Sequence, residues 1–190
     1  MTDIADSPFH AAALRQRSVP LLTITDLETL QPLLDRLRQR GVRCLEIALR
    51  SPVALQALAA VRRDHPDMLV AAGTVWTREQ WRAAEDAGAH CLISPAAPLE
   101  LLDHAAVAAT PWLPAAQTPT EFGLLRSAGY RIVKFFPAEA AGGVAAVRAL
   151  AAVLPEIRIC PSGGINADNR NSYLAEPAVA WVSGSWSGSA

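Results

Sequence analysis

Lys134 is the only lysine of the chain, and its surroundings make it a candidate nucleophile. The other 16 of the 17 basic residues are arginines, and Lys134 lies inside the apolar run 131–136. A surface position accepts arginine freely, so a position that keeps lysine in such a chain needs an amine. Apolar surroundings favour the neutral amine, which attacks a ketone to form a Schiff base. A structural lysine paired with an acid is the alternative interpretation.

Glu46 is the acid that could serve this amine. It lies in the apolar run 43–49, on the face opposite Leu45 and Ile47, because side chains alternate along a strand. A buried carboxylate is costly without a polar or cationic neighbour. We therefore predict that Glu46 meets Lys134, where it can move the protons that imine formation and carbon–carbon cleavage require. A purely structural salt bridge between the two remains the alternative.

Arg50 and Thr74 are candidate anchors for a substrate carboxylate. Arg50 lies on the same face as Glu46, and Thr74 is predicted to share a face with Val70 and Ala72 at the end of the next run. A guanidinium and a hydroxyl group both donate hydrogen bonds to carboxylate oxygens. Otherwise Arg50 is a solvated residue at a strand end, and Thr74 is a helix N-cap.

Two glycine turns are candidate phosphate sites. Gly163 and Gly164 follow the run 157–162 and are predicted to open a helix, and Gly184 and Ser185 end the run 179–185. Backbone N–H groups at such helix N-termini bind phosphate, and the loops after strands seven and eight of a barrel commonly do so. Tight turns without a ligand would have the same composition.

The elements that must position these residues are short apolar runs separated by helix-like stretches. This alternation predicts an α/β fold with a parallel sheet, and eight runs favour a closed (β/α)8 TIM barrel. The sequence ends after the eighth run, so the final helix is expected to be absent. The outer faces of the strands at its place would then be covered by residues 8–17, by another subunit, or not at all. The predicted strands are 19–25, 43–49, 68–73, 90–94, 111–114, 131–136, 157–162 and 179–185.

Composition limits the classes of partner. The 190 residues, 51% of them hydrophobic, predict one domain over 1–190 with 1–17 as an N-terminal segment. A net charge of −1 and the lack of a long apolar run argue against nucleic-acid and membrane partners. Three distant cysteines indicate free thiols and a cytoplasmic location. Four histidines without ligand spacing predict no metal, and we expect no cofactor.

Several motifs together resemble the KDPG (2-dehydro-3-deoxy-6-phosphogluconate) aldolase family, from about Val19 to Trp186. The segment 134–139, Lys-Phe-Phe-Pro-Ala-Glu, is the most specific of them. The others are Glu46-Ile47-Ala48-Leu49-Arg50, Ala72-Gly73-Thr74-Val75, Ile93-Ser94-Pro95, Thr118-Pro119-Thr120-Glu121, Pro161-Ser162-Gly163-Gly164-Ile165 and Gly184-Ser185-Trp186.

The resemblance implies a class I aldolase of the Entner–Doudoroff pathway that forms a homotrimer. Its substrate would be a keto acid phosphate, KDPG, cleaved to pyruvate and glyceraldehyde 3-phosphate, with 4-hydroxy-2-oxoglutarate as a second substrate. It implies that Lys134 forms the Schiff base and that Glu46 is the general acid and base. The implied substrate contacts are Arg50 and Thr74 for the carboxylate, Pro95 and Phe136 as apolar walls, Ser162 near the substrate, and Gly163, Gly164, Gly184 and Ser185 for the phosphate.

The sequence also departs from the family pattern beside the site. Ala96, Ala115 and Ser183 stand where glycine is usual, and Ser162 stands where threonine is usual. Two other functions therefore remain open: another phosphate-binding barrel enzyme, such as an epimerase or a decarboxylase, and a non-catalytic barrel that binds a keto acid or a protein partner.

Overall fold

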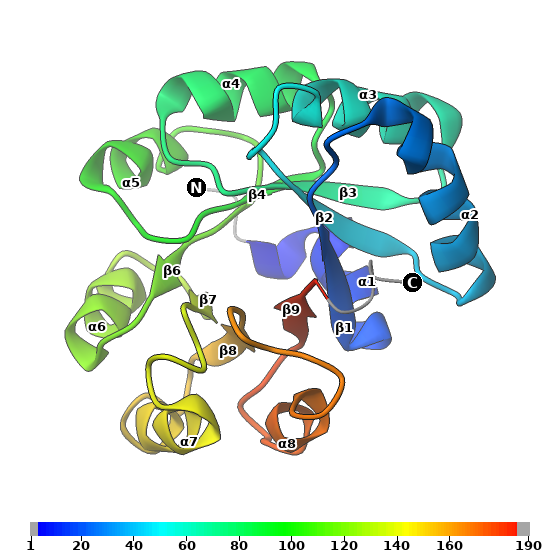
Figure 1. Cartoon of the computed structure of the whole chain (residues 1–190). Helices are drawn as coiled ribbons and strands as arrows, with labels where there is room; N and C mark the ends of the chain where they lie inside the picture. Colours follow the sequence, from blue (N-terminus) through cyan, green and yellow to red (C-terminus); the bar gives the residue numbers. More distant parts are fainter. Residues whose placement is uncertain (1–3, 186–190) are drawn as a thin grey trace.

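The computed structural model describes residues 4–185, and it consists of parallel strands with helices around them (Figure 1). The strands follow the predicted order along the chain, and every pairing between neighbouring strands is parallel. Their bounds are β1 Ser18–Leu22, β2 Cys44–Ala48, β3 Leu69–Gly73, β4 Cys91–Ile93, β5 Trp112–Leu113, β6 Ala115–Ala116, β7 Ile132–Phe135, β8 Arg158–Pro161 and β9 Val182–Gly184. The predicted α/β fold with parallel strands is confirmed.

The strands form a six-stranded sheet in the order β5-β4-β3-β2-β1-β9 and a three-stranded sheet in the order β6-β7-β8. Two isolated bridges, Ile159 to Val179 and Ser162 to Ser183, connect the segments of β8 and β9. At the other junction, only Pro114 separates β5 from β6. The predicted strand 111–114 is present as β5, but the short strand β6 that follows Pro114 was not predicted. Proline has no N–H group and interrupts the pairing, but the chain stays extended and β6 continues beside β7.

The surrounding helices begin and end at residues typical of helix ends. Thr77 and Thr118 each form a capping box at a helix start. Gly41, Gly88 and Gly129 follow helices with positive φ angles, as expected for helix ends. The bounds are η2 Leu27–Thr29, α2 Leu30–Gln39, α3 Ala54–Asp64, α4 Arg78–Asp86, α5 Leu99–Ala105, α6 Pro119–Ser127, α7 Gly143–Val153 and α8 Arg170–Leu174.

The helix after β2 has no side-chain cap. Ser51 precedes it, but α3 begins at Ala54, and the N-cap position is Val53. The hydroxyl group of Ser51 donates instead to the backbone carbonyl of Ile24. It therefore ties the loop after β2 to the loop after β1, at the end of the strands where Arg50 lies.

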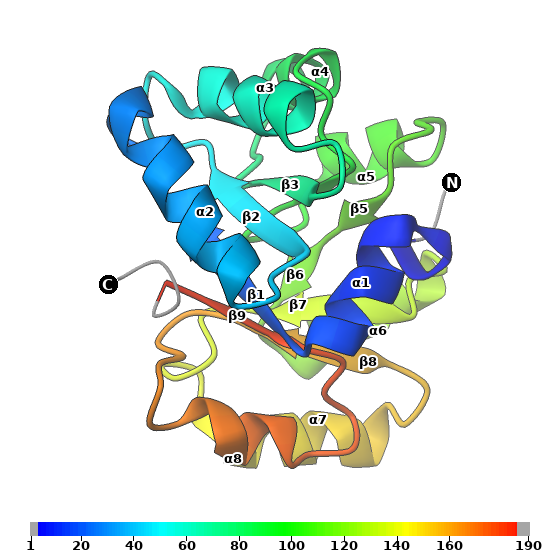
Figure 2. The ribbon, with the colours of Figure 1, turned by 90° about the vertical axis from the view of Figure 1, so that its right-hand side faces the viewer.

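The N-terminal segment, with η1 Ile4–Asp6 and α1 Pro8–Gln16, covers the amino ends of the strands. Figure 2 shows α1 at one end of the strands, apart from the surrounding helices. Phe9 is fully buried among the first residues of several strands, including Cys44, Cys91 and Ile132. Burying one such ring contributes about 1.5–3 kcal/mol. Residues 8–17 therefore do not cover the strands at the place where a final helix would lie. Residues 186–190 lie outside the described part of the chain.

Two side chains join α1 to the strands. Gln16 donates to the carbonyls of Ser18 and Cys44 and accepts from the N–H groups of Arg43 and Cys44. The guanidinium of Arg17 donates to the carbonyl of Leu174 at the end of α8 and to the carbonyls of Val179 and Ala180 shortly before β9. The first and last strands therefore share a common set of hydrogen bonds at this end, beside the β1–β9 pairing.

Candidate active site

Lys134 and Glu46 meet in the interior enclosed by the strands. Lys134 Nζ lies 3.4 Å from Glu46 Oε1, and the two residues are 5% and 1% exposed. They come from β7 and β2, which are distant in sequence and not adjacent in either sheet. Both side chains point inward because they alternate with outward-facing neighbours such as Val133 and Ile47, which belong to the outer core. The predicted convergence of these two residues is thus present.

The space for the carboxylate exists because residue 73 is glycine. A Cβ atom at Gly73 would lie 2.2 Å from Glu46 Oε1, closer than real Cβ contacts allow. On the other side, the hydroxyl group of Ser183 in β9 donates to Glu46 Oε2 over 3.0 Å. The carboxylate is therefore held between a bare backbone, a hydroxyl group and an amine, in a region that water does not reach.

The cysteines of the interior do not compete with Lys134 as nucleophiles. Burial raises the pKa of the Cys44 thiol to about 12. Burial, and secondarily the charge of Glu46, raises the pKa of Cys91 well above its ordinary value. Burial also strongly raises the pKa of Cys160, the partner of Lys134 in the β7–β8 register. All three thiols are protonated at neutral pH, and a thiol is a much weaker nucleophile than a thiolate.

Arg50 and Thr74 come together at the carboxyl ends of β2 and β3. Arg50 Nε donates to Thr74 Oγ1 over 3.2 Å. The prediction that Thr74 shares a face with Val70 and Ala72 was wrong, because those two residues face the outer helices. Thr74 has a φ angle of 62°, which ends the extended backbone and turns its side chain toward Arg50. Thr74 is not a helix N-cap, since α4 is capped by Thr77.

A cavity of about 670 Å³ lies at the carboxyl ends of β1, β8 and β9, where it is bordered by Arg50 and by the two glycine turns. Arg50 is the one charged side chain among the described residues that line it. Seven of the predicted site residues line this cavity: Arg50, Phe136, Ser162, Gly163, Gly164, Gly184 and Ser185. Lys134 lies next to it, with Nζ 5.6 Å from the centre of the Phe136 ring.

The turn at Gly163 and Gly164 requires glycine twice. Both residues have positive φ angles, 91° and 80°. An added Cβ atom would lie 3.0 Å from the Phe136 ring at Gly163 and 2.6 Å from Glu139 at Gly164. The prediction that this turn opens a helix was wrong, because α8 begins only at Arg170. Hydrogen bonds of the Asn166 and Asn169 side chains to the backbone hold the intervening segment as turns.

Pro95 lies apart from this cavity. It lines a second groove of about 480 Å³, on which Phe136, Trp76 and Leu99 also border. Phe136 therefore forms a wall between the two hollows, and Pro95 is on the far side of it. The structure brings the other predicted residues to one end of the strands, but neither Pro95 nor Thr74 is among the residues that line the cavity.

Comparison with known protein families agrees with this arrangement. The model of the family described as KDPG and KHG aldolase matches residues 11–190. The chain belongs to the KDPG and KHG aldolase family. The resemblance stated from the sequence motifs is thereby confirmed.

Relatives of known identity cover most of the chain at substantial similarity. The chain is 41% identical to 2-dehydro-3-deoxy-phosphogluconate aldolase of Dickeya dadantii, with 88% of this chain and 79% of the relative covered. It is 39% identical to KHG/KDPG aldolase of Escherichia coli, with the same shares covered. A crystal structure of KDPG aldolase from Legionella pneumophila, with pyruvate captured as a covalent carbinolamine, superimposes with a TM-score of 0.90 at 39% identity, covering 93% and 86% of the two chains.

Two further residues, Ser183 and Gly73, shape this KDPG-aldolase-like site and were not predicted to do so. Ser183 was noted as a departure from the family pattern, and its bond to Glu46 was not predicted, because β2 and β9 are separated by β1. Gly73 was noted only as part of a motif. A serine in the apolar run Val-Ser-Gly and a glycine beside a predicted inward-facing glutamate were the available signals.

Two features of the described segment bear on the expected partners of this family member. Within residues 4–185, no three His, Cys, Asp or Glu side chains are grouped so that they could hold a metal ion. The helices of the same segment include none that is long and apolar enough to span a membrane. The absence of a metal and a cofactor stays a prediction.

Proposed function

We propose that this chain is a class I aldolase, a lyase that cleaves KDPG to pyruvate and glyceraldehyde 3-phosphate and also acts on 4-hydroxy-2-oxoglutarate. The observation that carries the proposal is the buried Lys134–Glu46 pair, which lies 3.4 Å apart beside a cavity with a basic rim and two glycine turns. A single amine in contact with a carboxylate is the arrangement that Schiff-base chemistry needs. The sequence identity to KDPG aldolases over most of the chain supports the same function.

In the proposed reaction, Lys134 Nζ attacks the C2 carbonyl carbon of the bound keto acid phosphate and forms a carbinolamine. Glu46 donates the proton with which the C2 oxygen leaves as water, and an iminium ion remains. Glu46, now a carboxylate, removes the proton of the C4 hydroxyl group as the C3–C4 bond breaks. The bonding electrons flow into the iminium and produce an enamine, and glyceraldehyde 3-phosphate leaves. Glu46, which now carries the proton from the C4 hydroxyl group, protonates the enamine at C3, and addition of water then releases pyruvate and the free amine.

The residues around the cavity would bind the two charged ends of the substrate. Arg50 and Thr74, already joined by a hydrogen bond, would hold the carboxylate next to C2. The N–H groups of the turns at Gly163, Gly164, Gly184 and Ser185 would hold the phosphate. Ser162 lies at the start of the first turn, and Phe136 would shield the imine from water. Pro95 would act only through Phe136, since it lines the neighbouring groove.

The proposal extends to the architecture and assembly of the chain. The bridges between β8 and β9 and the short break at Pro114 support a closed (β/α)8 barrel in which β5 and β6 form one interrupted strand.

Trp76, Leu99 and Leu124 border the second groove and are 46%, 79% and 65% exposed. Such an apolar patch supports a homotrimer, which light scattering would test. Three free, buried cysteines support a cytoplasmic location.

Borohydride trapping with pyruvate, read by peptide mass spectrometry, tests the function. We expect a stable adduct on Lys134 and cleavage of KDPG in a coupled assay. The Glu46→Gln variant should lose turnover by about 10²–10⁴-fold, because it cannot exchange protons. A folded wild-type chain that forms no adduct would exclude the Schiff-base mechanism and favour an epimerase, a decarboxylase or a non-catalytic barrel.

A further inference from the structure

We propose that Ser183 is a positioning residue that fixes the orientation of the Glu46 carboxylate for proton transfer, an inference that rests on the proposed aldolase function. Ser183 lies in the middle of β9 and is 4% exposed. It does not line the cavity, and it is not one of the predicted site residues. It would therefore act on the reaction through Glu46 alone.

The two oxygen atoms of Glu46 have separate partners. Oε1 faces Lys134 Nζ at 3.4 Å, and Oε2 accepts the hydrogen bond of Ser183 Oγ at 3.0 Å. These are the hydrogen bonds of this carboxylate among the described residues. The terminal torsion of a glutamate has a broad energy profile and is not fixed by local sterics. A donor on Oε2 fixes that torsion and so aims Oε1 at the amine.

The neighbouring strands leave Ser183 little freedom. Its backbone pairs with Val19 of β1 and bridges to Ser162, which directly follows β8, so both sides of β9 are occupied at this residue. Across the interior, Gly73 supplies no side chain that could hold the carboxylate from the other direction. The other titratable neighbours, Lys134, Cys44 and Cys91, either face Oε1 or are thiols whose pKa is raised by burial. Oε2 therefore depends on Ser183.

Without the hydroxyl group, Oε2 would be a buried acceptor without a partner, and the carboxylate could rotate away from its aligned position. Proton transfer depends steeply on alignment, whereas the attack of Lys134 Nζ on the carbonyl carbon and the binding of the phosphate use other groups. Loss of Ser183 Oγ should therefore lower the rates of the steps in which Glu46 moves a proton. The affinity for substrate should change little.

The Ser183→Ala variant tests this inference with three measurements on the intact chain. We expect kcat for KDPG cleavage to fall about 10-fold while KM stays within about twofold. The exchange of the pyruvate methyl protons for deuterium from solvent, which reports the protonation of the enamine, should fall by the same factor. The extent of the borohydride adduct on Lys134 at saturating pyruvate should stay at the wild-type level.

Matched variants distinguish positioning from general damage. Ser183→Thr keeps the hydroxyl group and should restore most of the exchange rate. If Ser183→Ala does not fold, Ser183→Gly also lacks the hydroxyl group and should show the same loss of exchange. Ser94→Ala removes another buried hydroxyl group, one that accepts a hydrogen bond from Trp112 Nε1. That variant should lose thermal stability but keep its kcat.

The outcomes separate this inference from the proposed function. Equal exchange rates in the wild type and in Ser183→Ala would overturn the role of Ser183 and leave the aldolase assignment intact. A parallel loss in Ser94→Ala, or a loss confined to KM, would also overturn it. A wild-type chain without adduct and without exchange would instead contradict the aldolase function itself.

Discussion

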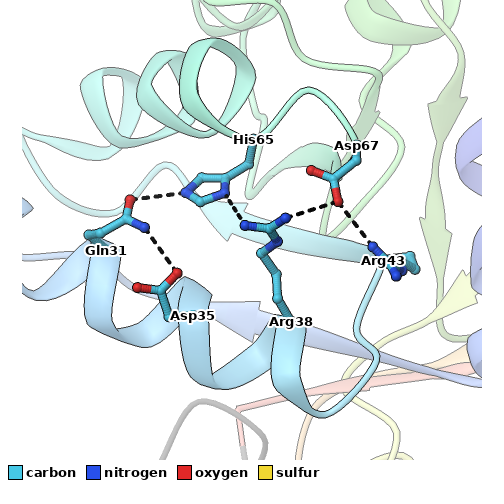
Figure 3. Close-up of polar contacts among 6 residues, drawn as sticks. All are labelled: Gln31, Asp35, Arg38, Arg43, His65 and Asp67. Atoms are coloured by element: carbon cyan, nitrogen blue, oxygen red, sulfur yellow. Dashed lines mark hydrogen bonds and ion pairs between the residues drawn. The ribbon is translucent and has the colours of Figure 1, made fainter.

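Two polar clusters of this molecule use similar residues for opposite purposes. The interior cluster consists of Glu46, Lys134 and Ser183 and lies beside the cavity. The helical cluster consists of Gln31, Asp35, Arg38, Arg43, His65 and Asp67 and lies around α2, the end of α3 and the start of β3 (Figure 3). Each contains a deeply buried ionisable side chain, but the two differ in how completely its hydrogen bonds are formed.

In the helical cluster the buried side chain is His65, which is 4% exposed. Arg38 Nη1 lies 3.2 Å from His65 Nδ1, and His65 Nε2 lies 3.0 Å from Gln31 Oε1. Because a guanidinium only donates, Nδ1 accepts and Nε2 donates, so both ring nitrogens are satisfied. Asp67 accepts from Arg38 and Arg43 at a half-exposed surface, where ion pairs contribute little.

In the interior cluster the two charges have few partners. Lys134 contacts Glu46 and the face of the Phe136 ring, at a distance typical of a weak cation–π contact. Its amine therefore remains available to a ligand in the neighbouring cavity, whereas the imidazole of His65 does not. The comparison indicates that a fully bonded buried group supports the fold, and an incompletely bonded one beside a cavity supports chemistry.

The largest expected effect concerns the amine. Lys134→Arg keeps a positive charge but cannot form an imine, so we expect KDPG cleavage to fall by about 10³-fold or more, to the background of the assay. The loss of the borohydride adduct on the corresponding peptide checks the cause. If arginine does not fit, Lys134→Met should give the same loss in a chain that far-UV circular dichroism shows to be folded. Retained turnover in either variant would contradict the assignment.

A smaller effect is expected from filling the space beside Glu46. In Gly73→Ala the new Cβ atom would displace the carboxylate, and we expect kcat to fall by about 10²-fold. Gly123→Ala in α6 is the matched control, because its Cβ atom would meet nothing within 4 Å. That control should keep its activity and gain about 0.5–1 kcal/mol in the free energy of unfolding. Equal activity of the two variants would show that Glu46 needs no such space.

The helical cluster should respond in stability rather than in activity. His65→Leu leaves Arg38 and Gln31 without their buried partner, so we expect a loss of about 1–3 kcal/mol in the free energy of unfolding. Urea unfolding measures it, and kcat should stay within about twofold of the wild type. A large loss of kcat without a loss of stability would show that the two clusters are not separate in function.

The smallest expected effect lies outside both clusters, at His90. Burial, and secondarily the charge of Arg62, lowers the pKa of His90 below its ordinary value. The unfolded chain then binds more protons than the folded chain between the lowered pKa and about pH 6.5. This contribution to stability is present above about pH 6.5 and is lost as the pH falls through that window.

The His90→Asn variant isolates this contribution, because asparagine offers the N–H group of Val70 a neutral acceptor in place of His90 Nδ1. We expect the unfolding free energy of the wild type to fall more steeply than that of the variant between about pH 7 and about pH 5. Parallel slopes in urea unfolding would assign the acid sensitivity to other groups.

The sequence predicted the parts of the site that depend on one strand at a time. Alternation placed Glu46 and Lys134 on the inward faces of β2 and β7, and eight apolar runs indicated parallel strands. It failed for Thr74, because the left-handed backbone at that residue interrupts alternation. The continuation of the fifth strand past Pro114 was missed for a similar reason, since proline also marks strand ends.

Contacts that join distant elements could not be predicted from local patterns. The Ser183–Glu46 bond spans 137 residues, and His65 meets Gln31 across 34 residues. The position of α1 depends on which end of the strands remains open, and the sequence of 8–17 is compatible with several places. Register, closure and the packing of one element over another require the three-dimensional arrangement.

The pairing of β1 with β9 has a consequence for the synthesis of the chain. Ser18–Leu22 is synthesised before Val182–Gly184, and one of its two edges has no partner until that later strand is made. An unpaired edge is a template for association with other chains. The hydrogen bonds of Arg17 to Leu174, Val179 and Ala180 also wait for that later segment. A nascent chain therefore carries an open strand edge between the synthesis of these two strands, and its protection in the cell falls to chaperones or to the speed of elongation.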